Sequence, residues 1–588
     1  MSHILGYGAH LNNVINFQCC RNSCSVAFEI LFPTFREESL RVMGNSASTS
    51  EGVSDQGYSQ LERKLQADLT YLKRAFTHLS ASKDANQQSI PLSTLERAFN
   101  LAPLNVADSA PSTLLSFISE IGPALTRTFF NNNSGQVDWP LFLSGFDMCC
   151  KQGLGAVKLK SLFLVFVKGK YKHELLPGLQ GEVDEDLTGF VTMSQLQDVF
   201  LICWLLMCHS RLENVQDSEE LYVPLPNLRP LLASCYAAIT GAPADTAWTG
   251  KEEIKVEKLT SWILATIPSI TESIEQYVKC HIQRLGSEKK NIKSEDKPAV
   301  QAMEAADKME NVPKDLEKAK AVDPGLLTFG TAWAIGLFLR DSSGSNLVAA
   351  ACDLLGSSTS YPTLLYRVST HGRGISRFWT RVEGYKAPLL MLISGTSIDY
   401  DKNEPSGAKW VVGVLVPGGF ENKEVFYGNS GCCLFAISPF FLPLRSTGKE
   451  TNHVYCHKRT PGAVYRSHPR PEGVGFGGSP GKERLWLDDE FLTVTIQHHA
   501  LDKSYHSGSL VPGQGYSPVK ARVGEVEVWG LGGASANEQH DKYQHRETLF
   551  SEQRRKVDLK NFGNWRDSPE ATMMEMISNP TKLEREER

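Results

Sequence analysis

The chain has 588 residues, of which 41% are hydrophobic and 22% charged, and its formal net charge is −5. These values are ordinary for a globular protein and favour two to four domains. The acidic balance argues against a nucleic-acid-binding protein, because such proteins usually present a basic face. The thirteen cysteines include no CxxC pair, which favours a reduced cytosolic setting.

Residues 1–54 are predicted to be a leader and a disordered segment. Within them, residues 43–48 read MGNSAS, the pattern of an N-myristoylation signal. Such a signal works only at the start of a chain, because the acyl group joins the free amine of glycine. We therefore expect a functional product that starts at Met43, with Gly44 as its lipidation site. A product that started at Met1 would not be acylated there.

The sequence predicts no membrane-spanning helix. The most apolar helical run, residues 199–208, has ten apolar residues, whereas a span needs about twenty. The N-terminus also lacks the charged start and continuous apolar run of a secretory signal. Any membrane contact is therefore expected to come from a lipid or from a partner.

Residues 55–285 are interpreted as one all-helical, EF-hand-like domain. Apolar residues at spacings of three and four from Leu61 to Leu79 predict a helix. Ser93 and Glu96 match a capping box and predict the start of another. Pro268 is expected to kink or divide the last helical stretch. The remaining predicted helices fall at 111–122, 139–150, 160–169, 194–208 and 259–285.

Two stretches of this domain resemble EF-hand loops. In the better one, Asp184, Asp186 and Thr188 take positions one, three and five, and Gln195 takes position twelve. That last position normally supplies a bidentate glutamate, whereas glutamine offers one neutral oxygen. We predict a degenerate calcium loop without tight binding, and calcium-gated binding through the two aspartates stays an alternative. Thr192 and Gln195 also match a capping box. The second loop, around Gly135, lacks charged ligands.

Residues 286–324 are charged and nearly free of aromatic side chains, which predicts a linker. Strand signals dominate from residue 325 to residue 565 and favour an antiparallel sandwich. Residues 566–588 are expected to form a C-terminal helix and tail, with a methionine face at 567–577. The predicted strands are 332–340, 387–394, 409–417, 431–438, 490–496 and 525–531, and the predicted helices are 362–368 and 374–382.

Several motifs could carry chemistry. Residues 473–478 match G-x-G-x-x-G, but no helix is predicted to follow, so tight turns between packed sheets are favoured over a dinucleotide site. Residues 488–490 read DDE and leave open a carboxylate-dependent hydrolase, although consecutive acids are more typical of a solvated turn. The histidines of residues 498–506 are interpreted as surface residues. We expect no cofactor and assign no metal site.

The stretch EVEVWG at 525–530 is more informative. Its alternation places Val526 and Val528 on one face of a strand, and Glu525, Glu527 and Trp529 on the other. A tryptophan among acids indicates either a second packed layer, which we slightly favour, or an interaction surface. These three residues are therefore the candidate interaction surface.

Five stretches, taken in order, resemble the TLDc domain family. They are 364–394, 410–419, 426–439, 473–491 and 526–531, of which VEVWG is the most specific. The resemblance spans about residues 325–565 and implies a β-sandwich of two antiparallel sheets with flanking helices. The expected fold class is therefore α+β and multidomain. The order of acylation signal, EF-hand-like helices and TLDc domain is similar to one subfamily.

The resemblance implies an interaction protein rather than an enzyme. TLDc proteins as a family engage the vacuolar H⁺-ATPase and affect its assembly, and some are linked to oxidative-stress resistance. The expected partners are subunits of this pump and, through a lipid at Gly44, a membrane surface, with no nucleic acid. The expected location is cytoplasmic, peripheral on vacuolar, lysosomal or other endomembranes.

Overall fold

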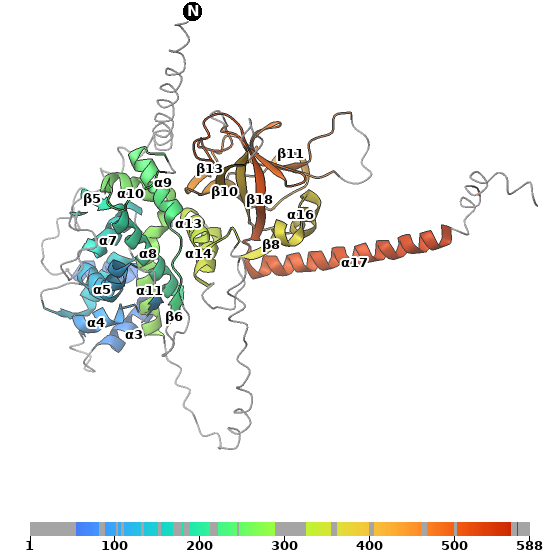
Figure 1. Ribbon diagram of the computed structural model, residues 1–588. Coiled ribbons are helices and arrows are strands. Elements are labelled where there is room, and N and C mark those ends of the chain that lie inside the picture. The colour runs from blue at the N-terminus through green and yellow to red at the C-terminus, as the bar shows by residue number, and fades with distance from the viewer. Residues whose placement is uncertain are drawn as a thin grey trace, which may run out of the picture.

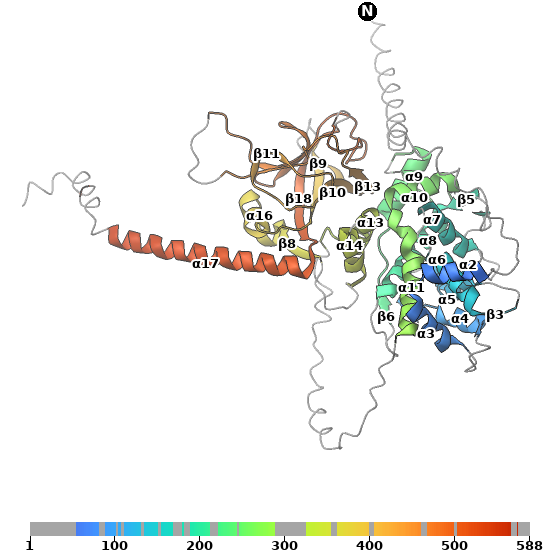
Figure 2. The ribbon, with the colours of Figure 1, turned by 180° about the vertical axis from the view of Figure 1, so that it is seen from behind.

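The computed structural model describes residues 55–565 and Met573, apart from several internal segments. Figure 1 shows a helical body and a strand-rich body, with helices α13 (Phe329–Phe338) and α14 (Ser342–Asp353) between them, and Figure 2 gives the same order from behind. No helix in the described part is long and apolar enough to cross a membrane. The internal segments left out are 81–88, 102–103, 107–110, 131–133, 151–154, 168–178, 181–187, 212–220, 244–245, 288–324, 341, 354–361, 399–404, 460–466 and 499–501.

The N-terminal body is helical, as predicted, and short strands separate several of its helices. Its helices are α2 (Asp55–Lys64), α3 (Leu69–Leu79), α4 (Leu92–Ala98), α5 (Ser112–Phe129), α6 (Trp139–Cys149), α7 (Gly155–Val167), α8 (Met193–Arg211), α9 (Arg229–Thr240), α10 (Val256–Thr266), the 3-10 helix η1 (Pro268–Glu272) and α11 (Ser273–Gly286). Its strands are β1 (Ile90–Pro91), β2 (Leu104–Val106), β3 (Gln136–Val137), β4 (Leu179–Gln180), β5 (Thr188–Thr192), β6 (Leu221–Val223) and β7 (Glu253–Lys255).

Two pairs of helix–strand–helix units build this body. Strand β1 pairs antiparallel with β3 through Ile90 and Val137, and β5 pairs antiparallel with β7 through Val191 and Ile254. All four side chains are buried. Each strand leads directly into a helix, respectively α4, α6, α8 and α10. The arrangement is EF-hand-like, because a short loop strand joins two helices and pairs with its neighbour's.

Local details differ from the predicted boundaries. The helix predicted from Leu61 to Leu79 is broken by a turn at residues 65–68. The capping box predicted at Ser93 is wrong. Helix α4 begins at Leu92, its N-cap is Pro91, and no side chain caps it. The pairing of β1 with β3 determines where the chain enters that helix. Pro268 divides α10 from α11, as expected.

The C-terminal body contains one curled sheet of eleven antiparallel strands. Hydrogen bonds join ten strands in the order β11-β14-β15-β16-β17-β18-β9-β10-β12-β13, and β8 also pairs with β18. The predicted α+β class and the antiparallel pairing are confirmed. The two sheets expected for the sandwich are one continuous path of strands that curls over its own core. The strands are β8 (Thr363–Arg367), β9 (Leu389–Ile398), β10 (Pro405–Val416), β11 (Lys423–Tyr427), β12 (Cys433–Ser438), β13 (Leu442–Arg445), β14 (Val454–His457), β15 (Gly473–Ser479), β16 (Lys482–Asp488), β17 (Thr493–Ile496) and β18 (Val519–Gly530). The accompanying helices are α15 (Val368–His371), α16 (Ile375–Val382) and α17 (Gly533–Trp565).

Two predicted elements of this body have the wrong type. Residues 332–340 were expected to be a strand, but they lie in and just after helix α13, whose N-cap Thr328 accepts a hydrogen bond from the Thr331 N–H. Residues 362–368 were expected to be a helix, but they form β8. In both cases a short apolar run carries no clear period, so packing against other segments decides the structure.

The hydrophobic core has two parts. One part fills the inside of the curled sheet and includes Phe378, Val526 and Val528. The other begins among the helices of the N-terminal body and continues through Trp333 of α13 to the outer face of the sheet at Phe435. The two bodies therefore share a continuous apolar interior.

A buried histidine, His209, and a half-buried one, His281, lie in the helical part of this interior. The ring centroid of His209, on α8, is 6.0 Å from that of His281, on α11, and both rings contact Tyr277. Burial lowers the pKa of each histidine to about 4, and the charge of Arg284 lowers both further. The two imidazoles are therefore neutral at pH 7.

We expect acidification to destabilise the helical body. An unfolded histidine titrates near pH 6.5, so between about pH 6.5 and pH 4 the unfolded state binds more protons than the folded state. Stability should fall across this window, as measured by urea unfolding at pH 7 and pH 4.5. His281→Gln should lose less stability on acidification than the parent. Equal losses in the two proteins would contradict the assignment.

Candidate functional site

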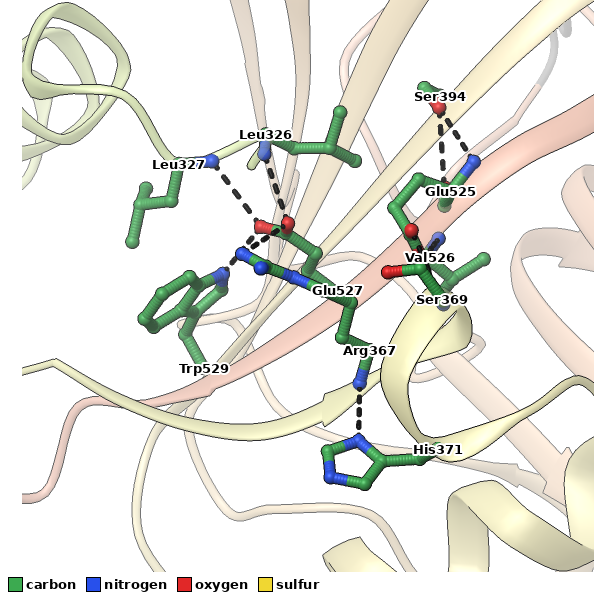
Figure 3. Close-up of polar contacts among 10 residues, drawn as sticks. All are labelled: Leu326, Leu327, Arg367, Ser369, His371, Ser394, Glu525, Val526, Glu527 and Trp529. Atoms are coloured by element: carbon green, nitrogen blue, oxygen red, sulfur yellow. Dashed lines mark hydrogen bonds and ion pairs between the residues drawn. The ribbon is translucent and has the colours of Figure 1, made fainter. Parts of the chain in front are cut away.

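The three residues predicted as an interaction surface lie on β18, but Glu527 is completely buried. Figure 3 shows that its carboxylate points toward Arg367, on β8, and toward the backbone that precedes α13. The placement of Glu527 on a surface is therefore wrong. The alternative of a second packed layer describes the structure, because residues of the helical core cover this face of the sheet.

Glu527 receives bonds from four groups. Arg367 Nη2 lies 2.8 Å from Oε1, and the Leu326 N–H donates to the same oxygen at 3.0 Å. Oε2 accepts hydrogen bonds from the Leu327 N–H at 3.3 Å and from Trp529 Nε1–H at 2.9 Å. We call these five residues the Glu527 cluster. A buried carboxylate is tolerated when it is both paired and hydrogen-bonded, and both conditions hold here.

Gly325 lies directly beside this cluster. Its φ angle is +64°, a left-handed conformation that favours glycine. A Cβ atom there would collide with Glu527 Oε1 and Arg367 Nη2. The chain can therefore approach the carboxylate closely only because residue 325 has no side chain.

Glu525 and Trp529 have different surroundings. The carboxylate of Glu525, which is half-buried, accepts hydrogen bonds from the Ser369 N–H at 3.1 and 3.3 Å, and so caps the start of α15. Trp529 is half-buried and packs against the core shared with the helices. Both residues contribute to the structure, and each retains an exposed part.

Sequence spacing could not have identified the partners of Glu527. Arg367 and Leu326 lie 160 and 201 residues before it in the chain (527 − 367 and 527 − 326). The alternation in EVEVWG correctly separated the two faces of β18. Only the tertiary structure shows what lies against the polar face.

The calcium-loop prediction is only partly placed by the structure, because Asp184 and Asp186 lie outside the described residues. Gln195 Oε1 accepts the Thr192 N–H at 2.9 Å, and the Gln195 N–H donates to Thr192 Oγ1 at 3.3 Å. The predicted capping box is thus formed. Thr188 is exposed at the start of β5.

The loop before β7, the strand that pairs with β5, is closed by the carboxylate of Glu252. Glu252 accepts hydrogen bonds from the Thr249 N–H at 2.7 Å, from the Thr249 hydroxyl at 2.9 Å and from the Gly250 N–H at 2.9 Å. These bonds lower the pKa of Glu252. Among the described residues, no group of three or more His, Cys, Asp or Glu side chains could hold a metal ion. Gly44 lies outside the described residues.

The acids at 488–490 form a turn between β16 and β17. The Asp488 carboxylate accepts the N–H groups of Leu492 and Thr493, at 2.8 and 2.9 Å, and the Thr493 hydroxyl at 2.8 Å. Asp489 and Glu490 are exposed. This favours the turn over a hydrolase centre.

The glycine-rich stretch at 473–478 belongs to the hairpin of β15 and β16. A Cβ atom at Gly473 would lie 2.7 Å from the indole of Trp486, and one at Gly475 would lie 3.0 Å from it. These two glycines therefore make room for a ring on the neighbouring strand, where the sequence interpretation expected turns between sheets.

Helix α17 provides an exposed surface. Near its start, the ring centroid of His540 lies 5.5 Å from that of Tyr385, and Gln544 Nε2 donates to the Glu383 carbonyl at 3.2 Å. From residue 545 to residue 556 every side chain is exposed, including Leu549 at 46% and Phe550 at 54%. Figure 1 shows the helix projecting from the strand-rich body, and at 1.5 Å per residue its 33 residues extend about 50 Å.

A family model described as the TLDc domain matches residues 347–532. The "MTOR-associated protein MEAK7" of Danio rerio is 22% identical over 179 residues, which cover 30% of this chain and 34% of that protein. The "Restriction of telomere capping protein 5" of Zygosaccharomyces rouxii is 26% identical over 232 residues, or 34% of this chain and 41% of that protein. The chain therefore matches less than half the length of these relatives.

We expect Glu527→Gln to destabilise the protein strongly, because it leaves the largely buried side chain of Arg367, which is 14% exposed, without a counter-charge. Breaking one side of a buried ion pair costs about 3–5 kcal/mol. Urea unfolding measures this loss. Glu525→Gln, on the half-exposed side chain of the same strand, should cost much less. Similar losses for the two variants would show that the buried pair has no special role.

We expect Gly325→Ala to lower the free energy of unfolding by about 1–3 kcal/mol, since the residue needs a positive φ and its Cβ would displace the cluster. Gly513→Ala is the matched control, because its φ is +65° and nothing lies within 4 Å of its Cβ. The difference between the two losses isolates the collision with Glu527. No difference would contradict a close approach at residue 325.

Proposed function

From the premise that residues 347–532 are a TLDc domain, we propose that this protein is a non-catalytic interaction protein that docks on the vacuolar H⁺-ATPase at endomembranes. Docking would modulate the assembly of the pump or its coupling to signalling, including the response to oxidative stress. The name of the zebrafish relative, an mTOR-associated protein, supports a protein partner in a signalling complex.

The observation that carries the proposal is the projecting part of α17. A helix that is polar along most of its length is not held by burial in its own fold. Here the first turns are packed on Tyr385 and Glu383, and the exposed residues 545–556 include the adjacent apolar residues Leu549 and Phe550. Exposed aromatic and apolar side chains on a rigid element are typical anchors of a protein interface.

Membrane attachment would have two parts. A single myristoyl chain at Gly44 gives only marginal binding, with an association constant on the order of 10⁴ M⁻¹. Residues 45–62 contain no Lys or Arg that could add attraction to anionic lipid. A protein contact through α17 would supply the missing affinity, in a product that starts at Met43.

Affinity purification of a Met43-start protein from endomembranes tests the proposal. We expect pump subunits to co-purify with the parent and to be lost from the double variant Leu549→Asp, Phe550→Asp, whose fold should be unaffected because both sites are exposed. Leu115→Asp is the matched control, since Leu115 is 50% exposed on the helical body. Gly44→Ala should reduce membrane recovery without removing pump subunits from the detergent-solubilised complex. Recovery of no pump subunit with the parent would refute the proposal.

A further inference from the structure

Helix α13 is an apolar helix with almost no exposed side. Gly330 and every residue from Ala332 to Phe338 are buried, and only Phe329 and Thr331 are partly exposed. A helix that is hydrophobic all round is stable in water only when it is enclosed by other elements. The helical body covers one side of α13, and the outer face of the sheet covers the other. Figures 1 and 2 both show α13 between the two bodies.

On the helical side, Trp333 is the central contact. Its indole is fully buried, lies edge-on to Trp204 at 5.6 Å, and directs Nε1–H toward the sulfur of Met207 at 3.3 Å. Trp204 is itself fixed by a hydrogen bond from its Nε1–H to the Pro224 carbonyl at 3.1 Å. A buried tryptophan on a helix, packed against tryptophan and methionine, is typical of a helix bound in a hydrophobic groove.

The two ends of α13 also contact the helical body. Gly330 passes so close to the backbone of Asn227 that a Cβ would lie 2.7 Å from its carbonyl oxygen. At the other end, the Ser269 hydroxyl of η1 donates to the Leu339 carbonyl at 3.5 Å. On the sheet side, Phe338 packs edge-on against Phe435 at 5.6 Å. The helix therefore has a fixed position and register in its groove.

In the two paired loops of this body, the described side chains of Gln195 and Glu252 bond to residues of their own loops. In sensor EF-hand proteins, calcium opens a helix pair and exposes a methionine-rich groove. Here the position-twelve side chain, Gln195, bonds to Thr192, and Glu252 bonds to Thr249 and Gly250. Met207 nevertheless contacts α13 through Trp333, within the core that the two bodies share.

We propose that residues 55–286 form a helix-binding domain that works without calcium, and that its ligand is α13 of the same chain. This contact is strong enough to hold the helical body and the TLDc domain together even after the chain is cut between them, within residues 288–324. This inference does not depend on docking to a proton pump.

The test separates the two halves after they have folded together. A protease site is placed between residues 300 and 310 of the full chain, the purified protein is cut, and the fragments are followed by size exclusion at micromolar concentration, in EDTA and in millimolar calcium. We expect the fragments to co-elute equally in both buffers. Separation in EDTA, or co-elution only in calcium, would overturn the proposal.

The Trp333→Ala variant tests whether the contact of Trp333 holds the two fragments together. Truncation of a central interface tryptophan usually weakens binding by about 30-fold or more, so these fragments should separate on dilution before the parent does. Trp333→Phe should weaken the association less. Trp486→Ala, a tryptophan on β16 that does not touch α13, is the matched control and should stay associated. Circular dichroism before cutting shows which variants fold, and a folded Trp333→Ala protein whose fragments behave like the parent's would assign the contact elsewhere.

Discussion

Helix α13 has no side that can face water, and this constraint organises the whole molecule. Its burial needs two apolar surfaces at once, and these are the groove of the helical body and the outer face of the curled sheet. A sheet with one face on its own core usually leaves the other face to solvent. Here that second face is apolar at Leu390, Leu392 and Phe435, because it packs against a helix.

The Glu527 cluster fixes where the chain enters α13. Two backbone N–H groups, from Leu326 and Leu327, have no partner in a helix or strand at this point, and the carboxylate accepts both. The ion pair with Arg367 provides the charge balance that makes a buried carboxylate acceptable. The most distinctive stretch of the TLDc resemblance, VEVWG, therefore serves to join the parts of the fold. In the proposed function, the partner is therefore contacted by the exposed part of α17 and not by this stretch.

The helical body combines an EF-hand-like arrangement of paired loop strands with a surface that packs against α13. The paired loop strands position α8 and α10 next to each other, and Gln195 and Glu252 accept hydrogen bonds from residues of their own loops. What remains in use is the groove, lined by Trp204 and Met207. A structural groove of this kind needs no signal to open, because its occupant belongs to the same chain.

The sequence by itself determined the order of the parts, the helical type of the first, the antiparallel sheet of the second and the two faces of β18. These properties depend on periodicity and on local motifs, which a single segment carries. The sequence did not determine the type of the segments at 332–340 and 362–368, nor the role of Glu527. In those places the same residues fit a helix, a strand or a surface, and the choice depends on partners up to 201 residues away. Only tertiary packing brings Leu326, Arg367 and Glu527 together, because burial of a charge is decided by all of its neighbours at once.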